Sequence, residues 1–462
     1  MPFPGRPNTT NTSETTKNHA FEPKRHRLLR LRICTLLVAS IAVAAAPLQA
    51  HGALPPRMQL GVDADNWSGQ IANPAFESSL REMQIDFISW HILPEEEADP
   101  ERLKTVVEFC RRNHWHYLFN TEIANYRRDE NRFRHQDGTY RYDLAETTLE
   151  SLKDDPLFVG LVYDEADVVQ SLLGMNIDKG RPIQPYLVDT RNLTASEAFL
   201  AVANKVGELT RRYAAYKKSI VFEMTFPDYP FAFARGGGLL APKLLKENYN
   251  DLMYDVYRGA ALEYRSSALW ACVDLWFLDK FPFGGKYGPS DHTPEQLLET
   301  LEFAYSAGFD SVYIEQVKGL MDESYHLTEY GRKVIEFQHW REAHGQGNWR
   351  TAPIQYYVRR FPDGYWGQSY STFIPDHPYG SWESNPYRSE DVTWFGLLHK
   401  LSGGTIPIDA DTWNAQRSPD FMGHPYQTMA SLPPMVIFDQ YGTVPAHTQA
   451  KVFDLLPTTP KP

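Results

Sequence analysis

Several apolar segments of strand length in this 462-residue chain run directly into a carboxylate. They end at Glu165, Glu223, Asp274 and Glu315, and stretches with helical periodicity separate them. Parallel strands joined by helices bring their carboxyl ends to the same edge of a sheet, and a closed barrel gathers those ends at one rim. The pattern therefore predicts an α/β fold of the (β/α)8 barrel type, in which distant acidic residues meet at one end.

The alternation of strands and helices continues along most of the chain after residue 57. Helix-to-strand connections are short, whereas the segments after the third, fourth and fifth predicted strands are long and rich in aromatic and charged residues. This asymmetry indicates that the carboxyl ends of the strands form the working face. We expect strands at residues 58–62, 85–90, 116–120, 158–163, 219–224, 269–273, 311–314 and 354–358. We expect helices at residues 74–83, 100–113, 144–153, 195–216, 242–265, 294–307 and 328–344.

The first fifty residues have the pattern of a secretory leader. A basic stretch precedes the apolar run at residues 33–47, and Ala50 lies at the position of a small-residue cleavage site. The run is short for a membrane-spanning helix, which favours cleavage over an uncleaved anchor. We therefore predict a secreted or periplasmic protein, with no stable membrane insertion after cleavage. The predicted organisation is a leader at 1–50, a catalytic barrel at 51–401, and a C-terminal extension or part of a small appended β-containing domain at 402–462.

The rest of the chain is acidic. The leader carries seven basic and two acidic side chains, so its removal leaves 39 Lys and Arg against 56 Asp and Glu, a formal charge of −17. Such a surface disfavours nucleic acids and anionic membranes as partners and suits a neutral polysaccharide or glycan. Aromatic residues make up 13% of the chain, and such residues line sugar-binding clefts as well as cores. Only Cys110 and Cys272 follow the leader, so we expect no disulfide framework.

Glu165 is the predicted general acid. It follows the fourth predicted strand, where barrel glycosidases commonly hold that group, and the nearby charges of Asp164 and Asp167 would favour its protonated form. Glu315, at the end of the seventh predicted strand, is the expected second carboxylate. It would act as a nucleophile or as the base that activates water, and the separation of the two groups decides between these roles. Asp274, at the end of the sixth predicted strand, is expected to assist.

Further polar and aromatic residues fall at or near the predicted strand ends. Aromatic faces stack on sugar rings, and carboxylates accept hydrogen bonds from sugar hydroxyls. We therefore expect substrate-binding residues among them, although some of the aromatic side chains are expected to pack in the core. For each carboxylate the alternative is a structural role, as a rim acid or in a salt bridge. The substrate-binding candidates are Trp67, Trp90, His91, Glu122, Tyr163, Asp164, Glu223 and Trp276.

Metal-dependent, serine-esterase and imine-forming mechanisms are less consistent with the residues at the predicted strand ends. His114 and His116 form a His-x-His pair, but it lies at the start of a predicted strand and therefore on the opposite face from the acids. The chain has no Gly-x-Ser-x-Gly elbow of a serine esterase. No lysine ends a predicted strand, as an imine-forming lysine would. We therefore predict neither a metal ion nor an organic cofactor.

The order of these acids along the predicted strands is similar to that of a known family. With Glu165 after the fourth strand, Asp274 after the sixth and Glu315 after the seventh, the chain resembles the (β/α)8-barrel glycoside hydrolases, and among them family 98. Members of that family cleave internal β-galactosidic bonds of host-type glycans with inversion. The resemblance, which covers residues 57 to about 360, implies an endo-acting enzyme. It also implies that Glu165 is the acid and that Glu315, with Asp274, activates the attacking water.

The predicted function is therefore that of an exported glycoside hydrolase. It would cleave a glycosidic bond in a polysaccharide or complex glycan by acid/base catalysis with paired carboxylates. A non-catalytic carbohydrate-binding barrel is one alternative, since it would use the same aromatic residues. A polysaccharide lyase or deacetylase is another, and a lyase would need a base near basic side chains such as Arg127, Arg128 and Arg235.

Overall fold

The computed structural model describes most of the chain between residues 57 and 359, and several short segments beyond. The described residues are 57–64, 67–92, 97, 99–121, 143–167, 188, 193, 195–225, 230–245, 250–275, 292–359, 396–397, 399–401, 403, 432–439, 443 and 449–454.

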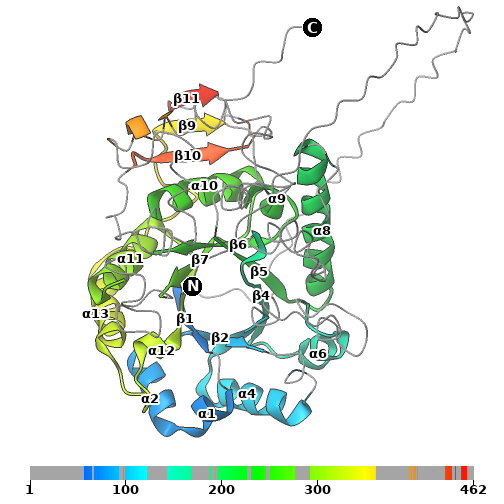
Figure 1. Ribbon diagram of the computed structural model, residues 1–462, viewed down its shortest axis with the longest axis vertical. Helices are drawn as coiled ribbons and strands as arrows, with labels where there is room; N and C mark the ends of the chain where they lie inside the picture. Colours follow the sequence, from blue (N-terminus) through cyan, green and yellow to red (C-terminus); the bar gives the residue numbers. More distant parts are fainter. Residues whose placement is uncertain are drawn as a thin grey trace, which may run out of the picture. The chain divides into compact units, whose positions relative to one another are not determined.

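Eight parallel strands of this part of the chain form a closed barrel, which confirms the predicted fold class (Figure 1). Each strand pairs with the next along the chain, and β8 pairs with β1 to complete the ring. The strands are β1 (Gln59–Ala64), β2 (Phe87–His91), β3 (His116–Asn120), β4 (Phe158–Tyr163), β5 (Ser219–Met224), β6 (Leu239–Leu244), β7 (Trp270–Asp274) and β8 (Ser311–Glu315).

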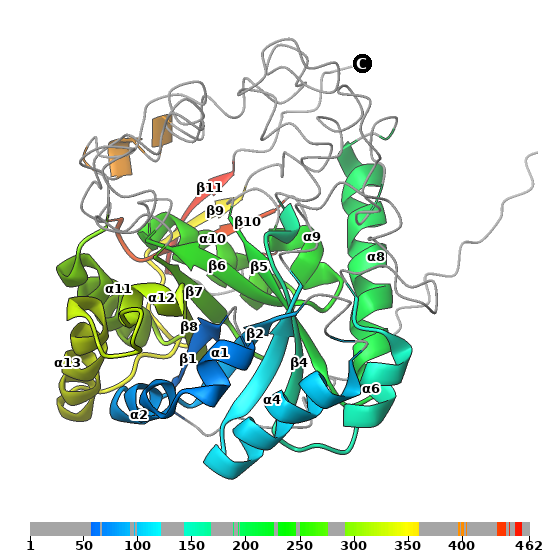
Figure 2. The same cartoon turned by 60° about the horizontal axis from the view of Figure 1, so that its bottom comes forward.

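Helices between the strands form the outer layer of the barrel (Figure 2). Several begin at a start signal in the sequence. The hydroxyl of Thr293 accepts a hydrogen bond from the N–H of Gln296, whose side chain accepts one from the N–H of Thr293, so a capping box starts α11. The helices are α1 (Trp67–Ala72), α2 (Pro74–Glu82), α4 (Pro100–Asn113), α6 (Glu146–Leu152), α8 (Ala195–Ala215), α9 (Pro230–Arg235), α10 (Asn250–Glu263), α11 (Pro294–Ala307), α12 (Val317–Leu320) and α13 (Glu329–Ala343).

The alternation of side chains along the strands produces two apolar layers. The larger layer lies between the strands and the helices and contains residues such as Leu60, Trp90 and Phe222. The smaller layer fills the interior of the barrel, and on most strands a polar residue follows it two positions later. The barrel is therefore packed below its carboxyl end, where the polar residues lie. The interior layer comprises Phe87, Leu118, Val162, Val221, Ala241, Trp270, Cys272 and Tyr313.

The sixth barrel strand was not predicted. β6 contains Pro242 and Lys243, in a segment whose sequence predicts a helix that begins at residue 242. Proline is common at the first position of a helix and rare inside a central strand, so the pattern favours the wrong element. The helix, α10, begins only at Asn250. As a consequence Asp274 lies on β7 and Glu315 on β8, one strand later than predicted.

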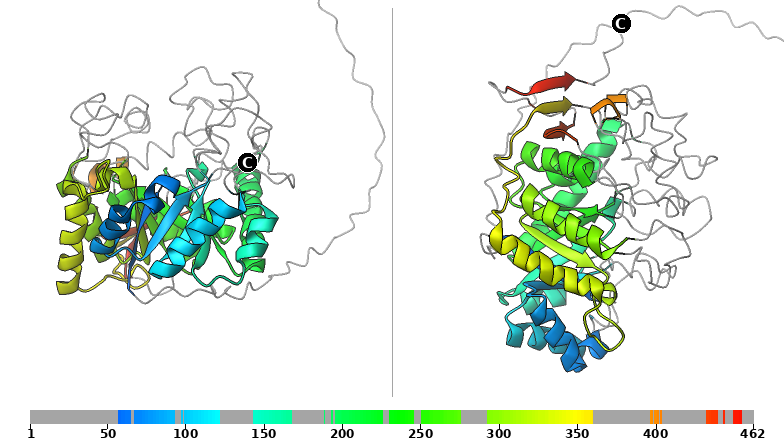
Figure 3. Two further views of the ribbon diagram at one scale, coloured as in Figure 1. Left: turned by 90° about the horizontal axis from the view of Figure 1, so that it is seen from below. Right: turned by 90° about the vertical axis from the view of Figure 1, so that its left-hand side faces the viewer.

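The predicted eighth barrel strand, at residues 354–358, belongs to a separate sheet. In this sheet β9 (Tyr356–Arg359) lies between β10 (Met435–Phe438) and β11 (Lys451–Asp454), and all three strands are parallel (Figure 3). An apolar run identifies a strand but not the sheet that the strand joins. The sheet combines residues from both sides of the predicted boundary at residue 401, and the division of the chain into domains stays a prediction.

Among the residues described, no helix is both long enough and apolar enough to cross a lipid bilayer. Residues 1–50 lie outside the described part of the chain, so the leader and the export of the protein stay predictions. Cys110 and Cys272 are both buried free thiols.

The small sheet packs against α10, as Figures 1 and 3 show. The hydroxyl of Tyr264, just after α10, donates a hydrogen bond to Asp439 at 2.8 Å, just after β10. At Gly259, an added Cβ would lie 1.7 Å from the carbonyl oxygen of Ile437 in β10. Only glycine permits this close approach of helix and strand.

We expect Gly259→Ala to destabilise the protein by roughly 1–3 kcal/mol, because the added methyl group must push β10 away from α10. Thermal or urea unfolding measures the change. Gly345→Ala is the matched control, since a Cβ at that position meets no atom within 4 Å. Equal stability of the two variants would contradict the contact between α10 and β10.

Candidate active site

A buried lysine lies among five carboxylates at the carboxyl ends of the barrel strands. The side chain of Lys243 is 1% exposed, and none of the five carboxylates is more than 8% exposed. We refer to these six residues as the Lys243 cluster. From Lys243 Nζ the distances to the nearest carboxylate oxygens are 2.7 Å for Glu223, 2.8 Å for Glu315, 3.1 Å for Asp274, 3.5 Å for Glu165 and 3.9 Å for Asp164.

Five neighbouring strands supply the cluster. Asp164 and Glu165 directly follow β4, and β5, β6, β7 and β8 each provide one residue. Glu223, Lys243 and Asp274 each lie two positions after a member of the interior apolar layer, as do Asp164 and Glu315. Strand alternation therefore directs these side chains into the barrel. Closure of the sheet then brings together residues that are far apart in the sequence.

Glu165 reaches the cluster by a different route. By strand alternation it would face outward, as Tyr163 does, because it directly follows the inward-facing Asp164. Its backbone φ is 45°, in the left-handed region that non-glycine residues rarely adopt. This turn lets two consecutive carboxylates approach Lys243 Nζ. Unusual backbone conformations of this kind concentrate at functional sites.

Glu165 and Glu315 lie on opposite sides of the barrel mouth, since β4 and β8 are four strands apart in a ring of eight. Their oxygens lie 3.5 and 2.8 Å from Lys243 Nζ, so the two oxygens are no farther apart than the sum of these distances. Their side chains are 8% and 3% exposed, which are the largest values among the five carboxylates. The side chains of Asp164, Glu223 and Asp274 have no exposed area.

Hydrogen bonds from interior residues orient two of the deeper carboxylates. The amide of Asn120, on β3, donates to Asp164 at 2.8 Å. The hydroxyl of Tyr313, on β8, donates to Glu223. All four residues are buried. The positions of these carboxylates are thus fixed by partners on other strands as well as by Lys243.

Burial raises the pKa of Glu223 well above its usual value. The charges of Asp164 and Glu315 add to the increase, and Lys243 opposes it. Glu223 therefore binds a proton more readily than an ordinary glutamate does. Several carboxylates in one buried site cannot all stay ionised, so a proton on one of them is the expected outcome.

Lys243 stays an ammonium ion. Burial alone would lower its pKa, but the charges of Asp274, Glu223 and Glu315 outweigh that effect and raise the pKa well above its usual value. Imine chemistry needs a lysine whose pKa is lowered, so that the neutral amine can attack a carbonyl carbon. Lys243 is thus unsuited to be such a nucleophile.

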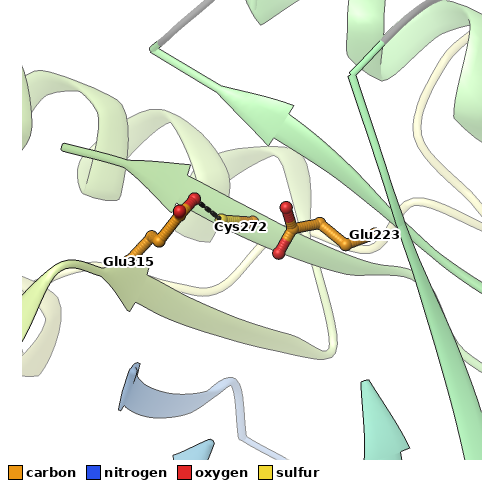
Figure 4. Close-up of side chains that lie close together, drawn as sticks. All are labelled: Glu223, Cys272 and Glu315. Carbon is orange, nitrogen blue, oxygen red and sulfur yellow. Dashed lines mark hydrogen bonds between the residues drawn. The ribbon is translucent and has the colours of Figure 1, made fainter. Parts of the chain in front are cut away.

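The same region contains a group of side chains with metal-like spacing. Among the described residues, donor atoms of Glu223, Cys272 and Glu315 lie within 4.8 Å of one another, and Figure 4 shows the two glutamates pointing toward each other with the thiol between them. The thiol donates to Glu315 at 3.6 Å. Lys243 Nζ lies within 2.8 Å of both glutamates. The ammonium therefore takes the place that a metal cation would need and would repel it.

The structure brings together the three predicted catalytic residues, Glu165, Asp274 and Glu315, around one ammonium. Asp164 and Glu223, which were predicted to bind substrate, belong to the same cluster. The sequence pattern of strands that end in carboxylates thus predicted which acids meet at this end of the barrel, while their catalytic and substrate-binding roles stay predictions.

Two aromatic candidates lie elsewhere. Trp90 packs against Phe109, and Tyr163 packs against Phe222, both in the layer between strands and helices. Each directly precedes an inward-facing residue, so strand alternation turns it outward. The prediction that Trp90 and Tyr163 bind substrate is therefore wrong.

The remaining candidates are only partly described. His91 is buried at the end of β2, and its Nε2 lies 2.5 Å from an oxygen of Asp63 on β1. Trp67 begins α1, but its side chain is outside the described part of the structure, as are Glu122 and Trp276.

The sequence pattern missed Lys243, and the expectation that no lysine ends a barrel strand is wrong. The available signal was the alternation of Leu239, Ala241 and Lys243, which the proline between the last two obscured. Asp63 was also missed. It follows the first predicted strand as the other acids follow theirs.

Comparison with protein families finds no match to the chain, and comparison with curated proteins finds none. Among solved structures, GH5_18 from Streptomyces cattleya in complex with GlcNAc is 12% identical over 83% of this chain and 98% of that chain, with a TM-score of 0.48. GH5_18 from Bifidobacterium longum subsp. longum is 13% identical over 67% and 84%, with a TM-score of 0.46. The catalytic domain of beta-amylase from Paenibacillus polymyxa is 10% identical over 63% and 99%, with a TM-score of 0.41.

These likenesses are too distant to carry an argument about the reaction, and the barrel assignment rests on the strand pairing itself. They give no support to the resemblance to family 98. That resemblance also placed Asp274 and Glu315 on the sixth and seventh strands, whereas they lie on β7 and β8.

We expect Glu223→Gln to fold and to gain stability relative to the wild type as the pH rises. The pKa of Glu223 is raised in the folded protein, so above the usual value of 4.5 the unfolded chain releases a proton that the folded protein keeps. The wild type therefore loses stability with rising pH through this group. Glutamine mimics the neutral carboxyl group and lacks that loss.

Thermal unfolding at about pH 5 and about pH 9 measures the effect. The difference in Tm between variant and wild type should increase in favour of the variant at the higher pH. A constant difference would show that Glu223 is ionised in the folded protein.

Proposed function

We propose that the protein is a glycoside hydrolase whose reaction takes place at the Lys243 cluster. The observation that supports this most directly is the pair of carboxylates Glu165 and Glu315 on opposite sides of the barrel mouth, the two acids of the cluster with any exposed side-chain area. Paired carboxylates on either side of a scissile bond are the usual machinery of glycoside hydrolysis. Lys243 is held as an ammonium, so the carboxylates are the groups of the cluster that can exchange protons or attack.

The spacing supports a mechanism with retention. Inverting enzymes hold their two carboxyl groups about 6.5–9.5 Å apart to admit a water molecule, whereas retaining enzymes hold them about 5–5.5 Å apart. The distances to Lys243 Nζ limit only the two nearest oxygens, which are no farther apart than the sum of 3.5 and 2.8 Å, and this close approach favours the retaining arrangement. We therefore assign Glu165 as the acid and Glu315 as the nucleophile, in place of the water-activating role that the resemblance to family 98 implied.

The two steps then follow from these positions. Glu315 would form a bond to the anomeric carbon as the glycosidic C–O bond breaks and Glu165 gives its proton to the leaving oxygen. Glu165 would next take a proton from water, whose oxygen displaces Glu315 from the sugar. Asp274, 3.1 Å from Lys243 Nζ, would help to hold the ammonium beside the nucleophile.

A lyase acting on uronates is less well supported. Such an enzyme needs a basic side chain to neutralise the substrate carboxylate. In the described part of the site that residue would be Lys243, which already lies within 4 Å of five carboxylates. Endo action, export and the identity of the glycan stay predictions from the sequence.

We expect Glu165→Gln and Glu315→Gln each to reduce turnover by about 10²–10⁴-fold or more, because each removes a proton donor or nucleophile. The measurement is the release of new reducing ends from a panel of neutral polysaccharides and host-type glycans. Glu108→Gln is the matched control, since Glu108 is an exposed residue of α4.

Either site variant with near-normal turnover would remove its residue from the mechanism. Glycan binding without cleavage by the wild type, unchanged in both variants, would instead support a sugar-binding barrel. An ultraviolet-absorbing product would indicate a lyase.

A further inference from the structure

Lys243 does more than neutralise charge. Its ammonium donates hydrogen bonds to Glu315 at 2.8 Å and to Asp274 at 3.1 Å, and it lies 2.7 Å from Glu223. An ammonium has three N–H donors, and two of them are used by Glu315 and Asp274. Lys243 lies on β6, between β5 and β7, and its side chain is only 1% exposed. The orientation of Glu315, the proposed nucleophile, is therefore set by Lys243.

The charge of Lys243 also affects how readily the neighbouring carboxylates bind protons. Carboxylates this close together and this deeply buried repel one another, and the loss of the neighbouring cation makes each of them bind a proton more readily. Glu315 must be ionised to attack a sugar, whereas Glu165 must carry a proton during part of the cycle. The closer position of Lys243 to Glu315 than to Glu165 suits this division. The titratable groups that face Lys243 are Asp164, Glu165, Glu223, Cys272, Asp274, Tyr313 and Glu315.

We propose that Lys243 is the positioning residue of this site: its ammonium orients Glu315 and keeps it ionised for attack, while the more distant Glu165 carries the proton. This inference rests on the proposed glycosidase function. Lys243 forms no bond to the substrate in this role. It is a fixed charge beside three side chains whose spacing would otherwise suit a metal ion.

The alternative is a lysine that only stabilises the barrel, and the chain offers a matched control for it. Lys218 is also buried, and its ammonium donates to the backbone carbonyls of Asp155 and Phe158 at 2.7 and 3.0 Å. It directly precedes β5 and therefore lies at the opposite end of the barrel from the site. Lys218→Met removes a buried ammonium without touching the Lys243 cluster.

The test compares Lys243→Met with Lys218→Met in the full chain, by turnover as a function of pH. We expect Lys243→Met to lose at least about 100-fold in kcat, and the acidic limb of its pH profile to move to higher pH, because its carboxylates take up protons more readily. Lys218→Met should lose stability but keep the wild-type profile. A Lys243→Met protein with the wild-type kcat and the wild-type acidic limb would overturn the proposal.

Two further measurements cover the other outcomes. If Lys243→Met does not fold, the double variant Lys243→Met/Glu223→Gln removes the nearest carboxylate together with the cation, and should fold with the same displaced limb. A wild-type limb in the double variant would also overturn the proposal.

If no glycan is cleaved by the wild type, the proposed function fails, but the charge role can still be tested by thermal unfolding. The loss of Tm in Lys243→Met should grow as the pH rises from about 4 to about 8, since its folded state keeps protons that the unfolded chain releases. The loss in Lys218→Met should change less. Equal pH dependence in the two variants would contradict the charge role of Lys243.

Discussion

The attraction between one buried ammonium and five carboxylates determines the properties of the carboxyl end of this barrel. Lys243 stands on β6, and the acids come from β4, β5, β7 and β8 on either side of it. Buried carboxylates at this spacing would repel one another strongly. A single cation among them offsets this repulsion only if the cation is fully charged and held in place. The barrel provides that fixed position, because closure of the sheet and the alternation of each strand point the side chains to one place.

The same interaction disfavours two classes of reaction at this site. A lysine held as an ammonium does not form imines. Because that ammonium lies between Glu223 and Glu315, it would repel a metal ion there. What remains is a set of carboxylates in which the pKa of Glu223 is raised, while Glu165 and Glu315 retain a small exposed fraction. Proton transfer and nucleophilic attack at an acetal carbon are reactions that such a set can perform.

The sequence predicted the barrel and the acidic residues of the site because both depend on short, regular patterns. Apolar runs that end in Glu223, Asp274 and Glu315 indicate strands and also place the acids at their carboxyl ends. The pattern failed at β6, because Pro242 resembles the first residue of a helix. Neither the strand nor the position of Lys243 was therefore predicted. It also failed for residues 354–358, because a run of apolar residues does not reveal which sheet it joins.

Two features of the site could not be predicted from the pattern of residue types. The direction of Trp90 and Tyr163 follows from the phase of strand alternation, which becomes certain only once the inward-facing residues are known. The approach of Glu165 to Lys243 depends on a backbone φ of 45°, which nothing in the sequence around it requires. The separation between Glu165 and Glu315, on which the choice between retention and inversion depends, is a property of the folded barrel alone.

We infer that Lys243 holds Glu165 and Glu315 at a spacing suited to retaining glycoside hydrolysis. The most direct measurement is the anomeric configuration of the first sugar product, followed by proton NMR before mutarotation. The account predicts that the product has the same anomeric configuration as the substrate. A product that appears first with the opposite configuration would contradict the assigned role of Glu315 and the spacing on which it rests.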